Sequence, residues 1–261
     1  MEADERRAGT PVLRDISDGV GWITLNRPKH MNAITVGLAC ELETAIRELG
    51  TAPAVNVVVI RGAGGNFCAG GDFDEVERLR SEGPEALRGL FTAFRRACDA
   101  IAAVQLPVLA AVEGVAMAGG FELMQAADIV LVSEAARIAD SHITFGMVPG
   151  GGSTQRLPRL VGRQLALGLL LSGDRLTGVD AMRLGLAYRS FAPAEFDSGV
   201  KQFATMLAAR QRAAVTTIKR LVYSSLGASP AAGLDDEIAA VVEHVSGDAG
   251  EGGIAAFGAR R

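Results

Sequence analysis

Two glycine-rich segments constrain the fold of this chain more than any other feature, because each follows a run of apolar, mostly β-branched residues. The segments are Phe67-Cys68-Ala69-Gly70-Gly71-Asp72 and residues 114–122, and the runs before them lie at 55–60 and 108–112. Such runs predict buried strands, and the glycines after them predict sharp turns into helices. The first N–H groups of a helix lack partners within it, so these turns can bind an anion or a developing oxyanion.

Strand-like runs alternate with helical patterns over the first 185 residues. The strand-like runs are 21–25, 55–61, 108–112 and 129–132. Thr35 is expected to cap one helix, and Pro84 to open a second that ends before Pro107. This alternation predicts an α/β fold with parallel strands joined by crossovers. Beyond residue 185 the strand signals fade, and long helical patterns cover 196–226 and 234–245, separated by Ser229-Pro230.

Composition narrows the class of protein. With 261 residues and 49% hydrophobic residues, the chain is long enough to bury a substantial core. A net charge of -4 argues against a nucleic-acid-binding surface, which needs clustered cations. Because the N-terminus lacks an apolar signal core and no apolar run approaches the length of a membrane span, we expect a soluble, cytoplasmic protein with no membrane partner.

The cysteines and histidines give no sign of a metal site. Cys40, Cys68 and Cys98 are odd in number and lack metal-ligand spacing, so we expect reduced, unreactive thiols. Cys68 lies inside the first glycine segment, but no histidine close in sequence would activate it as a nucleophile. The three histidines are far apart in the sequence: His30, His142 and His244.

Several separated motifs, taken in order, resemble the crotonase superfamily, also called the enoyl-CoA hydratase/isomerase family. The first glycine segment is similar to the family's Phe-x-Ala-Gly-x-Asp motif, and residues 119–122 to its Gly-Gly-x-Glu motif. Residues 146–158 resemble its Gly-x-x-Pro-x-x-Gly-x-x-x-Arg-Leu signature. Segments 26–33 and 255–257 extend the resemblance over nearly the whole chain, and the set is more specific than any one motif.

The resemblance implies a spiral of ββα repeats followed by a helical C-terminal region that forms homotrimers, often paired into hexamers. We therefore expect a crotonase-like α/β core over residues 1–195, with a flexible tail of about ten residues at its start, and an α-helical trimerisation region over 196–261. The alanine-rich and leucine-lined helices of this region are equally compatible with packing on their own domain. No internal sequence repeat shows the spiral independently.

The resemblance also implies a reaction. Glu122 occupies the position of a catalytic carboxylate, and Gly71 and Gly119 occupy the positions of the amides that form the oxyanion hole. We expect an enoyl-CoA hydratase in which Glu122 activates the water that adds to Cβ of a trans-2-enoyl-CoA thioester. Position alone favours a Glu122 that only caps its helix, and the match to the family's motif favours the catalytic role instead.

The chain departs from the family at the second catalytic glutamate. Aligned on Gly146 and Pro149-Gly150, the family's usual Pro-Glu falls on Ser141-His142. An imidazole with an unperturbed pKa of about 6.5 can donate or accept a proton at neutral pH. If the strand continues to His142, Asp140 lies on the same side and can orient the ring. A purely structural histidine is the alternative.

Further candidates line the expected binding site. Asp72 is expected to cap a helix beginning at Phe73, and Phe73 or Leu79 to border the acyl group. Lys29, with His30, matches a stretch near the adenine and phosphates of coenzyme A in the family, and Arg260 and Arg261 are weaker candidates. The expected substrate- or CoA-binding residues are Lys29, Ala69, Gly70, Asp72, Phe73 and Gly120.

Three other functions remain open. An enoyl-CoA isomerase needs one base to move a proton between Cα and Cγ. A β-diketone C–C hydrolase has a histidine at the position of His142, but its acidic partner lies in the following loop, where this chain has only Gly150 to Gly152. A non-catalytic member would bind acyl-CoA without turnover. In each case we expect no metal and no cofactor apart from the coenzyme A of the ligand, and the acyl chain length stays open.

Overall fold

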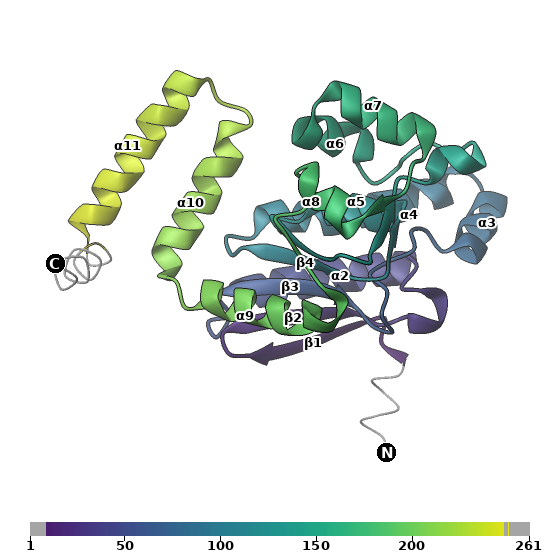
Figure 1. Cartoon of the computed structure of the whole chain (residues 1–261), viewed down its shortest axis with the longest axis horizontal. Helices are drawn as coiled ribbons and strands as arrows, with labels where there is room; N and C mark the ends of the chain where they lie inside the picture. Colours follow the sequence, from purple (N-terminus) through teal and green to yellow (C-terminus); the bar gives the residue numbers. More distant parts are fainter. Residues whose placement is uncertain (1–8, 248–249, 251–261) are drawn as a thin grey trace, which may run out of the picture.

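The apolar runs that alternate with helices form strands that lie side by side in one sheet. The computed structural model of the protein describes residues 9–247 and residue 250 (Figure 1). Strands β2, β3, β4 and β6 pair in parallel, which confirms the predicted α/β architecture. Within the described residues this larger sheet has the order β1 (Val12–Ser17), β2 (Val20–Leu25), β3 (Val57–Gly62), β4 (Val108–Val112), β6 (Ile129–Ser133) and β9 (Arg189–Phe191).

The two edge strands of this sheet were not predicted. β1 pairs antiparallel with β2, and four of its six residues are exposed, so its polar and apolar residues are mixed without a clear apolar run. β9 pairs in parallel with β6, so the prediction that strands end near residue 185 was wrong. With three partly exposed residues, β9 is too short to give a sequence pattern.

A smaller sheet explains how the chain winds. It contains β5 (Val115–Met117), β7 (Arg137–Ala139) and β8 (Leu176–Thr177), with β5 and β7 parallel. An isolated bridge between Cys68 and Ala116 adds the first glycine segment to this sheet. After each of β3, β4 and β6 the chain therefore crosses from the larger to the smaller sheet, which is the ββα spiral that the resemblance implies.

Local signals set the starts of several helices. Thr35 Oγ1 accepts a hydrogen bond from Leu38 N at 3.0 Å, and Pro84 occupies the first turn of α4, which ends four residues before Pro107. The helices of the core are α2 (Val36–Thr51), α3 (Phe73–Glu82), α4 (Pro84–Ala103), α5 (Gly119–Ala126), α6 (Ser153–Val161), α7 (Arg163–Ser172) and α8 (Gly178–Arg183). Single-turn helices lie at η1 (Pro28–His30), η2 (His142–Phe145) and η3 (Pro193–Glu195).

Both faces of the larger sheet are buried by apolar side chains. One face packs against α2, α4 and α5 in the main core. The opposite face carries Trp22 and Leu109, which pack against α9 (Phe196–Ala208) through Phe196, Val200 and Phe203. α9 therefore packs on the sheet (Figure 1). It also begins the segment expected to be the trimerisation region, and the boundary of that region at 195/196 stays a prediction.

The helical stretch expected over 196–226 is divided. α9 ends at Ala208, the chain is extended at Gln211, and α10 (Arg212–Ser225) begins in a new direction. The break at Ser229-Pro230 is confirmed, because Ser229 caps α11 (Pro230–Ser246). α10 and α11 extend away from the sheets (Figure 1). In the described part of the chain, the helices all fall short of the length and apolarity needed to cross a membrane.

One charged side chain ties α10 to the core. Lys219 is 8% exposed, and its ammonium donates to Ile101 O at 2.7 Å, Leu106 O at 2.9 Å and Asp128 Oδ2 at 2.6 Å. Tyr223, one turn later, donates to Asp128 Oδ1 at 2.6 Å. Burial raises the pKa of Asp128 and lowers that of Lys219, so desolvation opposes both charges and the direct bonds must offset it.

Replacing Lys219 should therefore destabilise the fold. We expect Lys219→Met to lower the free energy of unfolding by about 3–5 kcal/mol, because it leaves the Asp128 carboxylate buried without its cation. Arg220→Met, at the exposed neighbouring position, is the matched control. Urea unfolding monitored by circular dichroism measures both. Equal unfolding midpoints for the two variants would show that the buried pair does not hold α10.

Candidate active site

The smaller sheet brings the three motif-bearing turns together. Cys68 N donates to Val115 O at 2.9 Å, and Met117 N donates back to Cys68 O at 3.0 Å. On the other side, Ala118 N donates to Ala139 O at 3.0 Å. The turns that follow these three strand segments therefore lie next to one another, although they are up to 70 residues apart in sequence.

The two glycine turns approach each other closely enough to exclude side chains. A Cβ on Gly70 would lie 2.9 Å from Ala118 Cβ and 3.3 Å from Gly119 N, and one on Gly120 would lie 2.0 Å from Cys68 O. Gly70 also has a φ of +105°, which favours glycine. Ala118 itself has a φ of 48°, a conformation rare for a residue with a side chain. The two glycine turns therefore lie together, which their spacing in the sequence does not show.

Gly71 and Gly119 offer backbone donors at this point of convergence. Among the residues that the structure describes, neither N–H group has a hydrogen-bond acceptor. Gly71 is exposed, whereas Gly119 is buried at the first position of α5. A buried amide without a partner is unusual in a folded protein, so the arrangement can bind a carbonyl oxygen that develops negative charge.

Glu122 lies in the first turn of α5 and does not cap that helix. It is 2% exposed, and its Oε1 accepts hydrogen bonds from Gly151 N at 2.7 Å and Ser153 N at 3.1 Å. These amides are at the N-terminus of α6, which favours a negative charge there. Burial nevertheless raises the pKa of Glu122, because it outweighs these amides and the positive charge of His142. Glu122 Oε2 is free of such bonds and faces His142.

The imidazole of His142 lies between two carboxylates. Its Nδ1 is 2.7 Å from Asp140 Oδ1, and its Nε2 is 4.0 Å from Glu122 Oε2. Because a carboxylate only accepts, Nδ1 carries the proton toward Asp140 and Nε2 is the reactive nitrogen. Burial alone lowers the pKa of His142, but the Asp140 hydrogen bond and the two negative charges outweigh it and raise that pKa.

The backbone at His142 differs from the prediction. The strand β7 ends at Ala139 and His142 begins the single-turn helix η2, so Asp140 and His142 are not on one face of a continuous strand. The expected contact forms instead across this tight turn, where His142 N also lies 3.4 Å from Asp140 Oδ1. Asp140 is 1% exposed, and its second carboxylate oxygen has no hydrogen-bond partner among the described residues.

Asp72 supports the first glycine turn. Its Oδ1 accepts from Glu75 N at 3.1 Å, which confirms it as the N-cap of α3, and its Oδ2 is 2.8 Å from Arg27 Nη2. Burial would raise the pKa of Asp72, but these bonds outweigh it and the pKa is lowered. Buried Asn32 donates to the carbonyls of Ala63 and Asn66 at 3.0 and 2.7 Å. The sequence motif containing Arg27 and Asn32 gave no hint of these supporting roles.

The other candidate residues lie around this cluster or outside it. Phe73 is 78% exposed at the start of α3, whereas Leu79 is buried in the main core. Ala69 donates its N–H to Met31 O at 3.0 Å. Lys29 and His30 are exposed on η1. The candidates Arg260 and Arg261 lie outside the described residues.

The thiols are unsuited to nucleophilic chemistry. Burial raises the pKa of both Cys68 and Cys98 to about 12, so neither forms a thiolate at neutral pH. Cys68 Sγ lies 4.0 Å from Gly70 O, inside the packed turn. Cys40 is half-buried on α2 and lies apart from the catalytic candidates.

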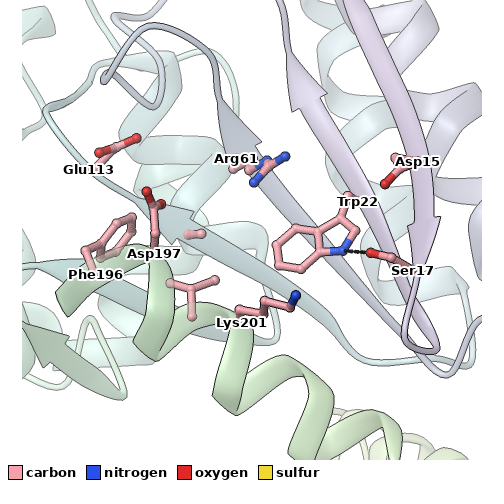
Figure 2. Close-up of a pocket in the computed structure, with 10 residues that line it drawn as sticks. Asp15, Ser17, Trp22, Arg61, Glu113, Phe196, Asp197 and Lys201 are labelled. Carbon is pink, nitrogen blue, oxygen red and sulfur yellow. Dashed lines mark hydrogen bonds between the residues drawn. The ribbon is translucent and has the colours of Figure 1, made fainter.

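A separate pocket of about 320 Å³ lies on the opposite face of the larger sheet, beside α9 (Figure 2). Arg61 stacks over the ring of Trp22 at 4.9 Å, and Trp22 donates to Ser17 Oγ at 3.0 Å. Burial and the neighbouring charge of Asp197 raise the pKa of Glu113. None of the motif residues lines this pocket, so the cluster of Glu122, His142 and the glycine turns is the candidate active site.

Comparisons with known proteins identify the family of this chain. The family model described as enoyl-CoA hydratase/isomerase matches residues 15–261. A probable enoyl-CoA hydratase of Rhizobium meliloti (strain 1021) is 34% identical over 250 residues, covering 96% of this chain and 95% of that protein. The match to the mitochondrial enoyl-CoA hydratase of Pongo abelii is 39% identical and spans 66% of this chain but 58% of that protein.

A related isomerase and solved structures extend the match. A peroxisomal Delta(3,5)-Delta(2,4)-dienoyl-CoA isomerase of Arabidopsis thaliana is 31% identical, covering 86% of this chain and 84% of that protein. The crystal structure of an enoyl-CoA hydratase from Polaromonas sp. JS666 has a TM-score of 0.92 at 30% identity, covering 96% of this chain and 97% of that chain. The solved hydratase shares the fold of this chain over nearly its full length. The chain therefore belongs to the enoyl-CoA hydratase/isomerase family, within the crotonase superfamily, and is an enzyme of that family.

Proposed function

We propose that the protein is an enoyl-CoA hydratase that adds water across the double bond of a trans-2-enoyl-CoA. The observation that carries the proposal is the pair of Glu122 Oε2 and His142 Nε2, 4.0 Å apart beside two unused backbone donors. That separation is too long for a direct hydrogen bond, but one water about 2.8 Å from each atom can bridge it. Several relatives of the chain are named enoyl-CoA hydratases, which supports the same reaction.

The chemistry follows from the charges of the pair. The thioester oxygen accepts from Gly71 and Gly119 N–H, which stabilises the enolate formed when the bridging water adds to Cβ. Glu122 takes the proton of that water as general base, and imidazolium His142 donates its Nε2 proton to Cα. The raised pKa of His142 favours the protonated ring that this step needs. Asp140 holds Nδ1 and keeps Nε2 directed at the reacting atoms.

Two other activities of the same site have support. The dienoyl-CoA isomerase relative favours an isomerase, although Gly150 to Gly152 provide no acidic residue. A C–C hydrolase gains from the 2.7 Å contact of His142 with Asp140, since Asp140 supplies the acidic partner that the following loop lacks. In that reaction His142 would activate water for attack on a carbonyl carbon. The C–C bond would then break and the released carbon would take up a proton.

The substrate and the assembly complete the proposal. Lys29 would meet the phosphates of coenzyme A, Phe73 would border the acyl group, and Ala69, Gly70, Asp72 and Gly120 would shape the turns that hold the thioester.

α10 and α11 expose large apolar side chains that a homotrimer or hexamer would cover, which supports residues 196–261 as the trimerisation region. We propose no cofactor beyond the coenzyme A of the substrate, and the cytoplasmic location stays a prediction. The exposed apolar residues are Ile218, Val222, Leu226, Leu234, Ile238, Val241, Val242 and Val245.

Substitution of either proton-transfer residue should abolish most of the activity. We expect Glu122→Gln and His142→Ala each to lower kcat for crotonyl-CoA hydration by about 10²–10⁴-fold, because each removes one general acid or base. The loss of enoyl-thioester absorbance, followed with crotonyl-CoA and a longer trans-2-enoyl-CoA, measures the rate. Glu85→Gln, at an exposed position on α4, is the control.

The outcomes separate the candidate functions. Dependence on Glu122 alone would return His142 to a structural role. No hydration with either chain length would sink the hydratase assignment and favour isomerisation or C–C hydrolysis. Thermal stabilisation by acyl-CoA without any turnover would indicate a binding protein.

The pH dependence of kcat/KM should be bell-shaped. Glu122 must be ionised, and its pKa is raised from 4.5, so activity falls as pH drops through that raised value. His142 must be protonated, and its pKa is raised from 6.5, so activity falls as pH rises through the second value. The two groups titrate as a coupled pair. Asp140→Asn should move the alkaline limb to lower pH, because the anion that raises the pKa of His142 is lost. An unmoved alkaline limb would count against an imidazolium donor.

A further inference from the structure

We propose that Arg156 is a positioning residue that fixes the orientation of the Glu122 carboxylate by clamping the peptide turn of residues 151–153, here called the glycine clamp turn. The inference rests on the proposed role of Glu122 as general base. Arg156 does not touch Glu122 or the reacting atoms. Its effect passes through the backbone that binds the carboxylate.

The direction of the Glu122 carboxylate depends on the glycine clamp turn. Oε1 takes hydrogen bonds from Gly151 N at 2.7 Å and Ser153 N at 3.1 Å, and these leave Oε2 directed toward His142. No side chain among the described residues donates a hydrogen bond to Glu122. A shift of the turn therefore turns Oε2 away from the position of the water.

The glycine clamp turn has little rigidity of its own. Gly150, Gly151 and Gly152 are consecutive, and glycine has more backbone freedom than any other residue. No larger residue fits at the centre, because a Cβ on Gly151 would lie 2.2 Å from Phe94 Cε1 and 2.7 Å from Glu122 Oε2. Gly152 has a φ of +121°, which also favours glycine. The rigidity must come from groups that bind the turn.

Arg156 supplies that binding at the carbonyl of Gly151, the residue whose N–H binds Glu122. Its Nη1 donates to Gly151 O at 2.5 Å, and its Nη2 is 3.5 Å from Asp99 Oδ1 on α4. A Cβ on Gly152 would lie 2.2 Å from Nη1, so the guanidinium passes directly over the turn. The fork of the guanidinium binds the carbonyl and the carboxylate together, which an ammonium cannot reproduce in the same geometry.

A second contact fixes the other end of the turn. Gln125, one helical turn after Glu122 on α5, donates through Nε2 to Ser153 Oγ at 2.9 Å. The turn is thus held by α5 at Ser153 and by Arg156 at Gly151. Loss of Arg156 releases the carbonyl of Gly151, and the N–H of Gly151 makes the shorter of the two hydrogen bonds to Glu122.

The test compares Arg156→Met and Arg156→Lys with Arg159→Met in the full chain. Arg159 lies on the same helix, and its side-chain hydrogen bond within the described part of the chain goes to Gln155 O of that helix, so it is the matched control. With crotonyl-CoA we expect kcat of Arg156→Met to fall by about 10-fold or more with KM within about twofold, since a small misplacement of a catalytic group is costly. Arg156→Lys should be intermediate and Arg159→Met unchanged.

The pH profile separates positioning from a general loss of stability. A carboxylate that loses an amide donor has a higher pKa, so the acidic limb of Arg156→Met should move to higher pH. The other titratable groups around Glu122 are His142, Asp140 and Cys98, and the variants retain all three. An Arg156→Met enzyme with the kcat and acidic limb of the unsubstituted protein would overturn the proposal.

Hydrogen exchange gives a readout that does not depend on turnover. We expect the peptide covering 146–157 to take up deuterium faster in Arg156→Met than in the unsubstituted protein, and at an unchanged rate in Arg159→Met. Unchanged exchange in Arg156→Met overturns the clamp even if hydration is observed. Absence of hydration in the unsubstituted protein instead defeats the hydratase assignment, and exchange then decides whether Arg156 holds the turn.

Discussion

The row formed by Cys68, Ala116 and Ile138 in the smaller sheet is the constraint on which the candidate site depends. Cys68 pairs with Ala116, and Ala116 pairs in parallel with Ile138. Because these neighbouring segments are parallel and in register, the residues that follow the row by two or three positions on each segment also lie together. They are the two glycine turns and Asp140. The N–H groups of Gly71 and Gly119 and the Asp140–His142 pair therefore lie at the same edge of the sheet.

Backbone amides supply most of the hydrogen-bond donors for negative charge at this edge. Glu122 is a buried carboxylate that accepts hydrogen bonds from two N–H groups at the start of α6. Gly71 and Gly119 present two more N–H groups, which have no acceptor in the part of the chain that the structure describes. Backbone donors are fixed by the fold, so they need little reorganisation when charge develops. His142 stands where the family usually has a second carboxylate, and Asp140 binds its ring on the side away from Glu122. A protonated imidazole at 4.0 Å would stabilise the Glu122 carboxylate, whereas a second carboxylate at that separation would compete with it for a proton.

Much of the fold could be predicted because its signals are local. The cap at Thr35, the cap at Asp72 and the proline at the start of α4 each act within one helical turn, and the parallel strands are long apolar runs. The edge strands β1 and β9 escaped prediction because β1 is mostly exposed and mixes polar with apolar residues, and β9 has only three residues. The division between α9 and α10 has no breaker residue. It arises where α9 stays on the sheet and Arg212 binds Val55 O.

The candidate residues and their local spacing can be read from the sequence alone: two glycine turns after strands, a glutamate three residues into a helix, and a histidine two residues after an aspartate. The Asp140 and His142 contact was expected on one face of a continuous strand, but it forms across the tight turn after β7. The contact of Glu122 with His142 and the binding of its carboxylate by residues 151–153 are visible only in the tertiary structure. Those contacts join segments about 20–30 residues apart. Their geometry depends on strand register and helix packing, which no local pattern encodes.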